Sequence, residues 1–76
     1  MMELFGTSSC EECNIIKQLL QKTPLEWRYN DVSLIQDYTG NIPLLIDGNK
    51  RIYGLFQIEN HINKTLEQMG FIGGIP

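Results

Sequence analysis

Two cysteines separated by two residues, Cys10 and Cys13, are the side chains best suited to chemistry in this sequence. They follow the apolar run 1–5 and precede 14–22, a run with helical apolar spacing. Because a helix start offers free backbone N–H groups and a positive dipole end, it favours a thiolate over a thiol. The i, i+3 spacing keeps both sulfurs on one helical face, within reach of a disulfide. One sulfur could therefore attack a disulfide and the other resolve it.

The residues around the cysteines also predict where this helix begins. Ser9 is followed three residues later by Glu12, which is a capping box, and Ser8 with Glu11 repeats the pattern one residue earlier. We therefore expect the helix to start at these serines, with Cys10 in its first turn.

Three other interpretations of the cysteine pair compete with a redox pair. A closed structural zinc site needs four ligands, whereas the chain has two cysteines and one histidine, His61, so we expect no metal within the chain. A purely structural disulfide would close too small a loop to stabilise much. A non-catalytic partner-binding domain, whose thiols are incidental or bind metal between two chains, is the alternative from a different functional class. A working redox pair is the leading interpretation.

Composition narrows the possible partners. The 76 residues suit a single domain, 1–76, and the 42% hydrophobic content is typical of a globular chain. The net charge of −3, without a run of Lys or Arg, argues against nucleic acid, and no apolar run reaches membrane-spanning length. No basic, then apolar, leader precedes the first strand, so we expect a cytoplasmic protein, and we expect it to fold alone as a monomer.

Hydrophobic periodicity predicts an α/β chain with the element order βαβ, a short helix, then ββα. The elements are a strand at 1–5, a helix at 11–22, a strand at 25–30, a short helix within 31–38 opened by Ser33 and Gln36, strands at 41–46 and 51–53 joined by a turn at 47–50, and a helix from 55 to Gly70. Trp27 is expected in the core and His61 on the surface. Residues 70–76 are expected either to dock on the domain or to fray.

Apolar stripes predict which helix faces are buried. The first helix places Ile15, Ile16, Leu19 and Leu20 at helical spacing, and the last helix does so with Leu55, Ile58, Ile62, Leu66 and Met69. The two helices should cover a four-stranded mixed sheet, made of a parallel βαβ unit and an antiparallel hairpin.

With this element order, the motifs Cys10-Glu11-Glu12-Cys13, Ile42-Pro43 and Tyr53-Gly54 make the chain resemble glutaredoxins and small glutaredoxin-like redoxins, which share a minimal thioredoxin fold. The resemblance implies a thiol–disulfide oxidoreductase in which Cys10 is the nucleophile, Cys13 resolves the mixed disulfide, and Pro43 follows a cis peptide bond. It also implies a substrate-binding surface made by Ser9, Ile42, Pro43, Tyr53, Gly54 and Leu55. It implies no bound cofactor.

The sequence departs from the family pattern in three places. Glu11-Glu12 replaces the usual Pro-Tyr, and these two carboxylates should modulate the pair by disfavouring the Cys10 thiolate. Thr7 stands where many glutaredoxins have Lys or Arg. Residues 53–57 lack the acidic pair that holds glutathione. The electron donor could therefore be glutathione or a protein such as thioredoxin reductase, and the resemblance suggests disulfide-containing clients such as ribonucleotide reductase.

Overall fold

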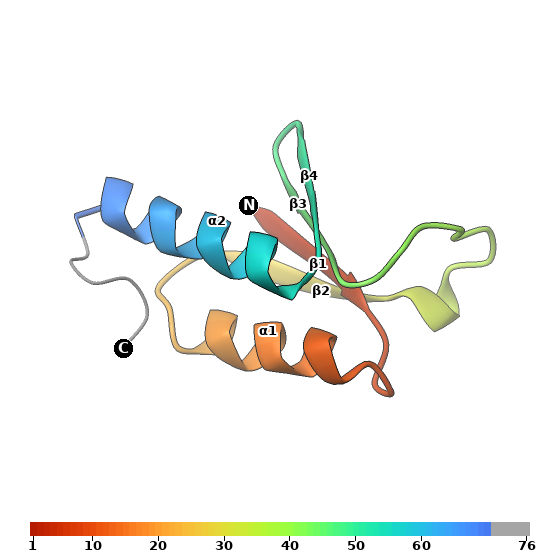
Figure 1. The fold of residues 1–76 in the computed structure, drawn as a ribbon. Coiled ribbons are helices and arrows are strands. Elements are labelled where there is room, and N and C mark those ends of the chain that lie inside the picture. Colours follow the sequence, from red (N-terminus) through yellow and green to blue (C-terminus); the bar gives the residue numbers. More distant parts are fainter. Residues whose placement is uncertain (71–76) are drawn as a thin grey trace.

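A computed structural model of the chain, which describes residues 1–70, has the predicted order of strands and long helices. The elements are β1 (Met2–Gly6), α1 (Glu11–Gln21), β2 (Trp27–Asp31), the 3-10 helix η1 (Val32–Leu34), β3 (Leu44–Asp47), β4 (Lys50–Tyr53) and α2 (Leu55–Gln68) (Figure 1). No helix within this described part is long and apolar enough to cross a membrane.

The four strands form one mixed sheet in the order β2-β1-β3-β4. β1 pairs in parallel with β2, which α1 makes possible as the crossover, and β3 pairs antiparallel with both β1 and β4. The β3–β4 hairpin turns at Gly48-Asn49, where Gly48 has φ 61°, a conformation that glycine adopts without steric cost. The predicted parallel unit and antiparallel hairpin are therefore confirmed.

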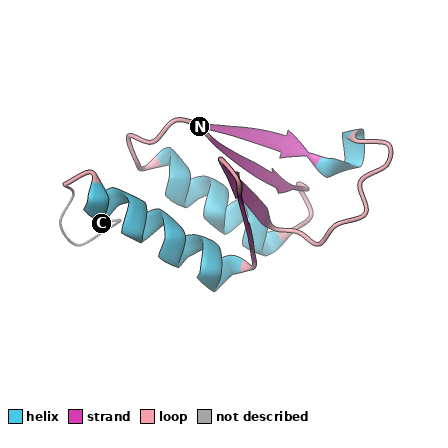
Figure 2. Ribbon diagram, turned by 90° about the horizontal axis from the view of Figure 1, so that it is seen from above, coloured by secondary structure: helices cyan, strands magenta, loops and turns pink. Residues whose placement is uncertain are grey.

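Both helices lie on the same side of the sheet and share one core with it (Figure 2). The core consists of Met2, Leu4, Ile16, Leu20, Leu45, Ile58, Ile62 and Leu66. Trp27 packs against this cluster, as predicted, and so does Leu25. Leu25 nevertheless lies before β2, because its N–H bonds to the Thr23 hydroxyl at 3.3 Å in the preceding turn. Each predicted apolar stripe contains one exposed residue, because Ile15 is 40% exposed and Met69 is 54% exposed.

The short helix predicted within 31–38 is wrong in length and in its cap. Asp31, rather than Ser33, caps η1, and its carboxylate accepts from the Ser33 N–H at 3.0 Å and the Ser33 hydroxyl at 2.7 Å. η1 stops after Leu34, which is 84% exposed. η1 has no buried residue, and isolated helical turns are not stable by themselves.

His61 is not the solvated residue that the sequence predicts. Its Nε2 lies 2.8 Å from Asp47 Oδ2, and its side chain is only 17% exposed. The pair connects α2 to the end of β3, across 14 positions in the sequence. After α2, Gly70 has φ 95° and its N–H bonds to Glu67 O at 3.0 Å, as expected for a helix end, whereas the rest of the predicted tail lies outside the described residues.

Candidate active site

The two cysteines lie at the start of α1, joined in a disulfide with a Cα–Cα distance of 5.2 Å. The predicted cap is wrong, because Cys10 itself is the N-cap residue and its Sγ accepts the Cys13 N–H at 3.1 Å. A cap residue has extended backbone, and Cys10 has φ −88° and ψ 111°. The sulfur of Cys10 thus takes the place of the serine oxygen that a capping box would provide.

The two sulfurs differ in their access to solvent. Cys13 is fully buried, with 0% exposure, whereas Cys10 is only partly buried. Cys10 Sγ also lies at the positive end of the helix dipole and accepts a backbone N–H, two features that stabilise a thiolate. In the reduced pair, Cys10 is therefore the sulfur that a disulfide from outside could reach and the one best placed to be ionised.

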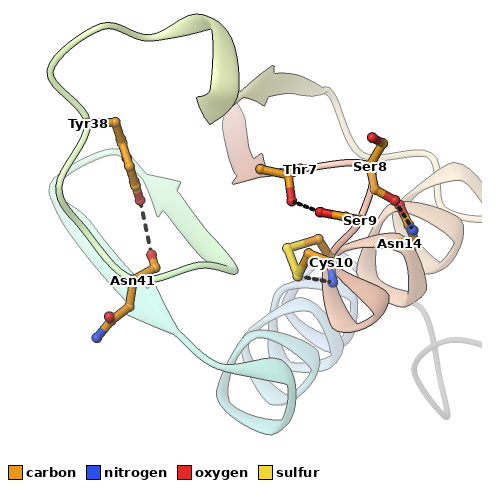
Figure 3. The surroundings of a disulfide bond; sticks show 8 residues. Thr7, Ser8, Ser9, Cys10, Asn14, Tyr38 and Asn41 are labelled. Atoms are coloured by element: carbon orange, nitrogen blue, oxygen red, sulfur yellow. Dashed lines mark hydrogen bonds between the residues drawn. A yellow bond between two sulfur atoms is a disulfide. The ribbon is translucent and has the colours of Figure 1, made fainter.

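The loop before Cys10 is held by its own polar groups (Figure 3). Thr7 and Ser9 join their hydroxyls at 3.2 Å, and the Asn14 side-chain amide donates to Ser8 O at 3.1 Å. The Cys10 N–H closes the turn on Thr7 O at 3.2 Å. Ser9 is exposed beside Cys10, so its role in the structure is to shape this loop rather than to cap the helix.

Gly6, which the sequence analysis did not single out, is the residue against which Cys13 packs. A Cβ added to Gly6 would lie 2.7 Å from both Cys13 Cβ and Cys13 Sγ, closer than carbon atoms can approach without displacement. Only glycine therefore lets α1 approach β1 at this depth. The position of Gly6 between the first strand and the cysteine loop was the only sign of this in the sequence, and it did not predict the contact with Cys13.

Pro43 lies at the same end of the sheet as the dithiol. The register pairs Phe5 with Leu44, so the next residues on each strand, Gly6 and Pro43, are neighbours. The Ile42–Pro43 bond is cis, as the resemblance implied, and Pro43 O accepts the Gly54 N–H at 3.2 Å. Within the described chain, no hydrogen bond uses the N–H or C=O of Ile42. These two groups are thus available to an extended peptide.

The remaining predicted contact residues differ in exposure. Leu55 packs against the core, so its side chain belongs to the fold. Tyr53 is 42% exposed and lines a hollow of about 480 Å³ on the sheet face opposite the helices, together with Phe5 and Leu44. Phe56, which is 78% exposed in the first turn of α2, is the large apolar side chain presented near Gly54.

Beneath α1, Tyr29 and its neighbours form a charged cluster that the sequence analysis also missed. The Lys17 ammonium lies 4.4 Å from the centroid of the Tyr29 ring. Burial, and then the nearby Asp31 carboxylate, raise the pKa of Tyr29. Hydrogen bonds from Ser33 lower the pKa of Asp31, and Lys17 adds to this effect. Tyr29 and Asp31 are close in the sequence, but Lys17 joins them only when α1 packs against β2.

Glu11 and Glu12 are exposed in the first turn of α1, where their charges reduce the positive potential at Cys10. We expect the Glu11→Gln/Glu12→Gln double variant to favour the Cys10 thiolate and to raise the reduction potential of the pair by roughly 10–20 mV. Thiolate absorbance against pH and equilibration in a redox buffer would measure both effects. Glu67→Gln, at the far end of α2, is the matched control. The assigned role would be contradicted if the double variant changed the reduction potential no more than Glu67→Gln does, or lowered it.

Within residues 1–70, no three His, Cys, Asp or Glu side chains come together in a way that could hold a metal ion. The cysteine pair is therefore the chemically distinctive group of the described chain, and Cys10 and Cys13 are joined to each other.

Comparison with known proteins supports the fold. No protein-family model matches the chain, and no curated protein matches it. Among solved structures, the thioredoxin-like protein BC3987 is similar, with a TM-score of 0.62 and 23% identity over 91% of this chain and 99% of that one. The chain therefore has the thioredoxin-like fold, a four-stranded mixed sheet with helices, and it carries a Cys-x-x-Cys pair at the start of its first helix.

Proposed function

We propose that this protein is a thiol–disulfide oxidoreductase of the glutaredoxin-like type, with Cys10 as nucleophile and Cys13 as resolving thiol. The observation that carries the proposal is the difference between the two sulfurs: Cys10 is accessible and accepts a helix N–H, whereas Cys13 is fully buried. Because only the accessible sulfur can meet a disulfide on another molecule, the order of the two steps follows from burial.

The reaction proceeds in two exchanges. The Cys10 thiolate attacks one sulfur of the substrate disulfide, a mixed disulfide forms, and the other substrate sulfur leaves as a thiolate that takes up a proton. The Cys13 thiolate then attacks Cys10 Sγ, which forms the Cys10–Cys13 disulfide and releases the second substrate thiol. An external reductant returns two electrons and two protons to the pair.

Ile42 and Pro43 are proposed to hold the substrate peptide beside Cys10. The free N–H and C=O of Ile42 can pair with an extended peptide as a neighbouring strand would, while the Pro43 carbonyl is occupied by Gly54. Ser9, Tyr53, Gly54 and Leu55 complete the proposed surface. Leu55 supports it from the core, and Gly54 allows α2 to begin close to Pro43.

The residues of the proposed substrate surface and its neighbour Phe56 favour a protein donor over glutathione. Phe56 and Tyr53 are exposed, and aromatic side chains are typical of protein-binding surfaces. Residues 53–57 contain no acidic side chain to hold the ammonium group of glutathione. We therefore propose that a reductase such as thioredoxin reductase is the electron donor. We also propose that the protein is a cytoplasmic monomer and that its clients are disulfide-containing proteins such as ribonucleotide reductase.

A two-arm turnover assay tests this proposal. A small mixed disulfide is offered to the protein with glutathione and glutathione reductase, or with thioredoxin reductase, and NADPH consumption is followed. We expect saturable turnover with thioredoxin reductase and weak turnover with glutathione, and Cys10→Ser should abolish both. Efficient saturable turnover only in the glutathione arm would contradict the proposed donor.

A further inference from the structure

The full burial of Cys13 raises a problem that the proposed reaction must solve. In the second exchange, Cys13 has to react as a thiolate, yet it is 0% exposed and water does not reach it. Burial of a charge without a hydrogen-bond partner is costly, and it keeps a thiol protonated. The N–H of Cys13 itself serves Cys10 Sγ, so the Cys13 sulfur requires a donor from another element.

Tyr29 on β2 brings a polar side chain close to Gly6, where this sulfur also lies. A carbon placed at the Cβ position of Gly6 would lie 2.7 Å from Cys13 Sγ and 3.6 Å from the Tyr29 hydroxyl oxygen. The Cys13 sulfur and the Tyr29 hydroxyl therefore both lie next to the position that a Gly6 side chain would occupy. Because Gly6 is buried and has no side chain, nothing from β1 separates them.

The surrounding contacts hold Tyr29 in this position. β2 pairs Tyr29 with Leu4 and Asp31 with Gly6, so the Tyr29 side chain lies on the core face of the sheet, and it packs against the core cluster. Lys17 covers the ring at 4.4 Å from the centroid, one helical turn after Cys13. The ring is thus packed between β2 and α1, and its hydroxyl lies toward the dithiol end of the sheet.

We propose that the Tyr29 hydroxyl is the hydrogen-bond donor to the Cys13 sulfur when the pair is reduced, and that it stabilises the thiolate that resolves the mixed disulfide. This inference rests on the proposed function. Tyr29 keeps its proton in the step: the electron pair on Cys13 Sγ forms the bond to Cys10 Sγ, the substrate sulfur leaves with the electrons of the broken bond, and the proton that Cys13 loses ends on this departing sulfur, which leaves as a thiol. Tyr29 is a positioning and charge-stabilising residue.

The charges near the hydroxyl are consistent with a neutral donor. Burial and Asp31 raise the pKa of Tyr29, which keeps the phenol protonated at neutral pH. The charged groups next to Tyr29 are Lys17, which lies on the ring, and Asp31, which accepts a hydrogen bond from Ser33. Glu11 and Glu12 are exposed on the outer turn of α1, and β1 contributes only Gly6.

The test separates the two exchanges kinetically in wild type, Tyr29→Phe and the matched control Tyr38→Phe. Tyr38 donates to Asn41 O and stacks on Phe5. Figure 3 shows that Tyr38 and Asn41 lie apart from Cys10. We expect Tyr29→Phe to slow resolution of the mixed disulfide about tenfold, because hydrogen bonds to charged groups are among the strong ones. We also expect the pH dependence of its resolution rate to shift upward by about one pH unit, because a tenfold change in the equilibrium constant for thiolate formation corresponds to one pKa unit. Tyr38→Phe should change neither the rate nor its pH dependence.

Two further readouts keep the test decisive. If Tyr29→Phe does not fold, fluorotyrosine at position 29, which makes the phenol a stronger donor without changing its shape, should move the profile down instead. Attack by Cys10, measured in Cys13→Ser, tests the proposed function alone, because Cys13 has no part in that step. Normal attack with an unchanged resolution rate and profile in both Tyr29 variants would overturn this inference and leave the proposed function intact.

Discussion

Exposed to a disulfide substrate, Cys13→Ser should accumulate a stable mixed disulfide on Cys10, whereas Cys10→Ser should form almost none. The accessible sulfur attacks first, and without Cys13 nothing within the chain displaces the adduct. Mass spectrometry of the quenched reaction, with peptide mapping of the modified cysteine, measures the trapped fraction. The wild type should release its adduct and end as the Cys10–Cys13 disulfide.

The control for this prediction is a direct measurement of how accessible each cysteine thiol is. Alkylation of the reduced single-cysteine variants should be at least about tenfold faster at Cys10 than at Cys13, because Cys13 is fully buried. An adduct on Cys13 in Cys10→Ser, together with none on Cys10 in Cys13→Ser, would reverse the assigned roles.

Gly6→Ala should strongly destabilise this fold, because the added methyl group would collide with Cys13. The new Cβ would meet Cys13 Cβ and Sγ at 2.7 Å, and neither atom is the end of a flexible side chain. We expect a loss of about 1–3 kcal/mol of unfolding free energy, which corresponds to a fall in Tm of roughly 4–8 °C for each kcal/mol in a chain of this size. We also expect slower resolution, because Cys13 must shift.

Gly48→Ala is the matched control for this effect. Gly48 has φ +61° and nothing lies within 4 Å of an added Cβ, so alanine there costs backbone strain alone, about 1 kcal/mol, in a turn remote from the cysteines. It should lower Tm without changing the reaction of the dithiol. A Gly6→Ala protein with unchanged Tm and unchanged resolution would show that α1 does not depend on this contact.

Much of the fold was predictable because its signals are local and periodic. Ile16 and Leu20 recur at helical spacing, and so do Ile58, Ile62 and Leu66, and these are the residues that the core buries. The turn at Gly48 follows from the backbone freedom of a single residue. The strand predicted at 41–46 instead begins at Leu44, after Pro43, which has no N–H to donate to a strand ladder. The mixed pairing followed from the element order and from simple rules of connection.

The local polar contacts were harder to predict, because several residues competed for the same backbone groups. Ser8, Ser9 and Cys10 could each precede the first turn of α1, and the cysteine sulfur took the cap position. Asp31 likewise took the cap of η1 before Ser33 could open a helix. A capping box in the sequence identifies a region of two or three residues rather than the cap itself.

The contacts missed at the site join residues that are far apart in the chain. His61 finds Asp47 only after α2 packs beside the hairpin, and Tyr29 reaches the space beside Gly6 only when β2 lies next to β1. The burial of Cys13, which distinguishes the two sulfurs, likewise depends on the approach of α1 to β1. Spacing within the motif shows that two cysteines can pair, but the sheet behind them decides which one meets a substrate.

Reduction of the insulin disulfides with dithiothreitol as reductant tests the central claim most directly, since it needs neither a specific donor nor a specific client. The wild-type protein should accelerate the precipitation of the insulin B chain in proportion to its concentration, and Cys10→Ser should give the uncatalysed rate of dithiothreitol alone. Equal rates for wild type and Cys10→Ser would contradict the assignment of this protein as a thiol–disulfide oxidoreductase.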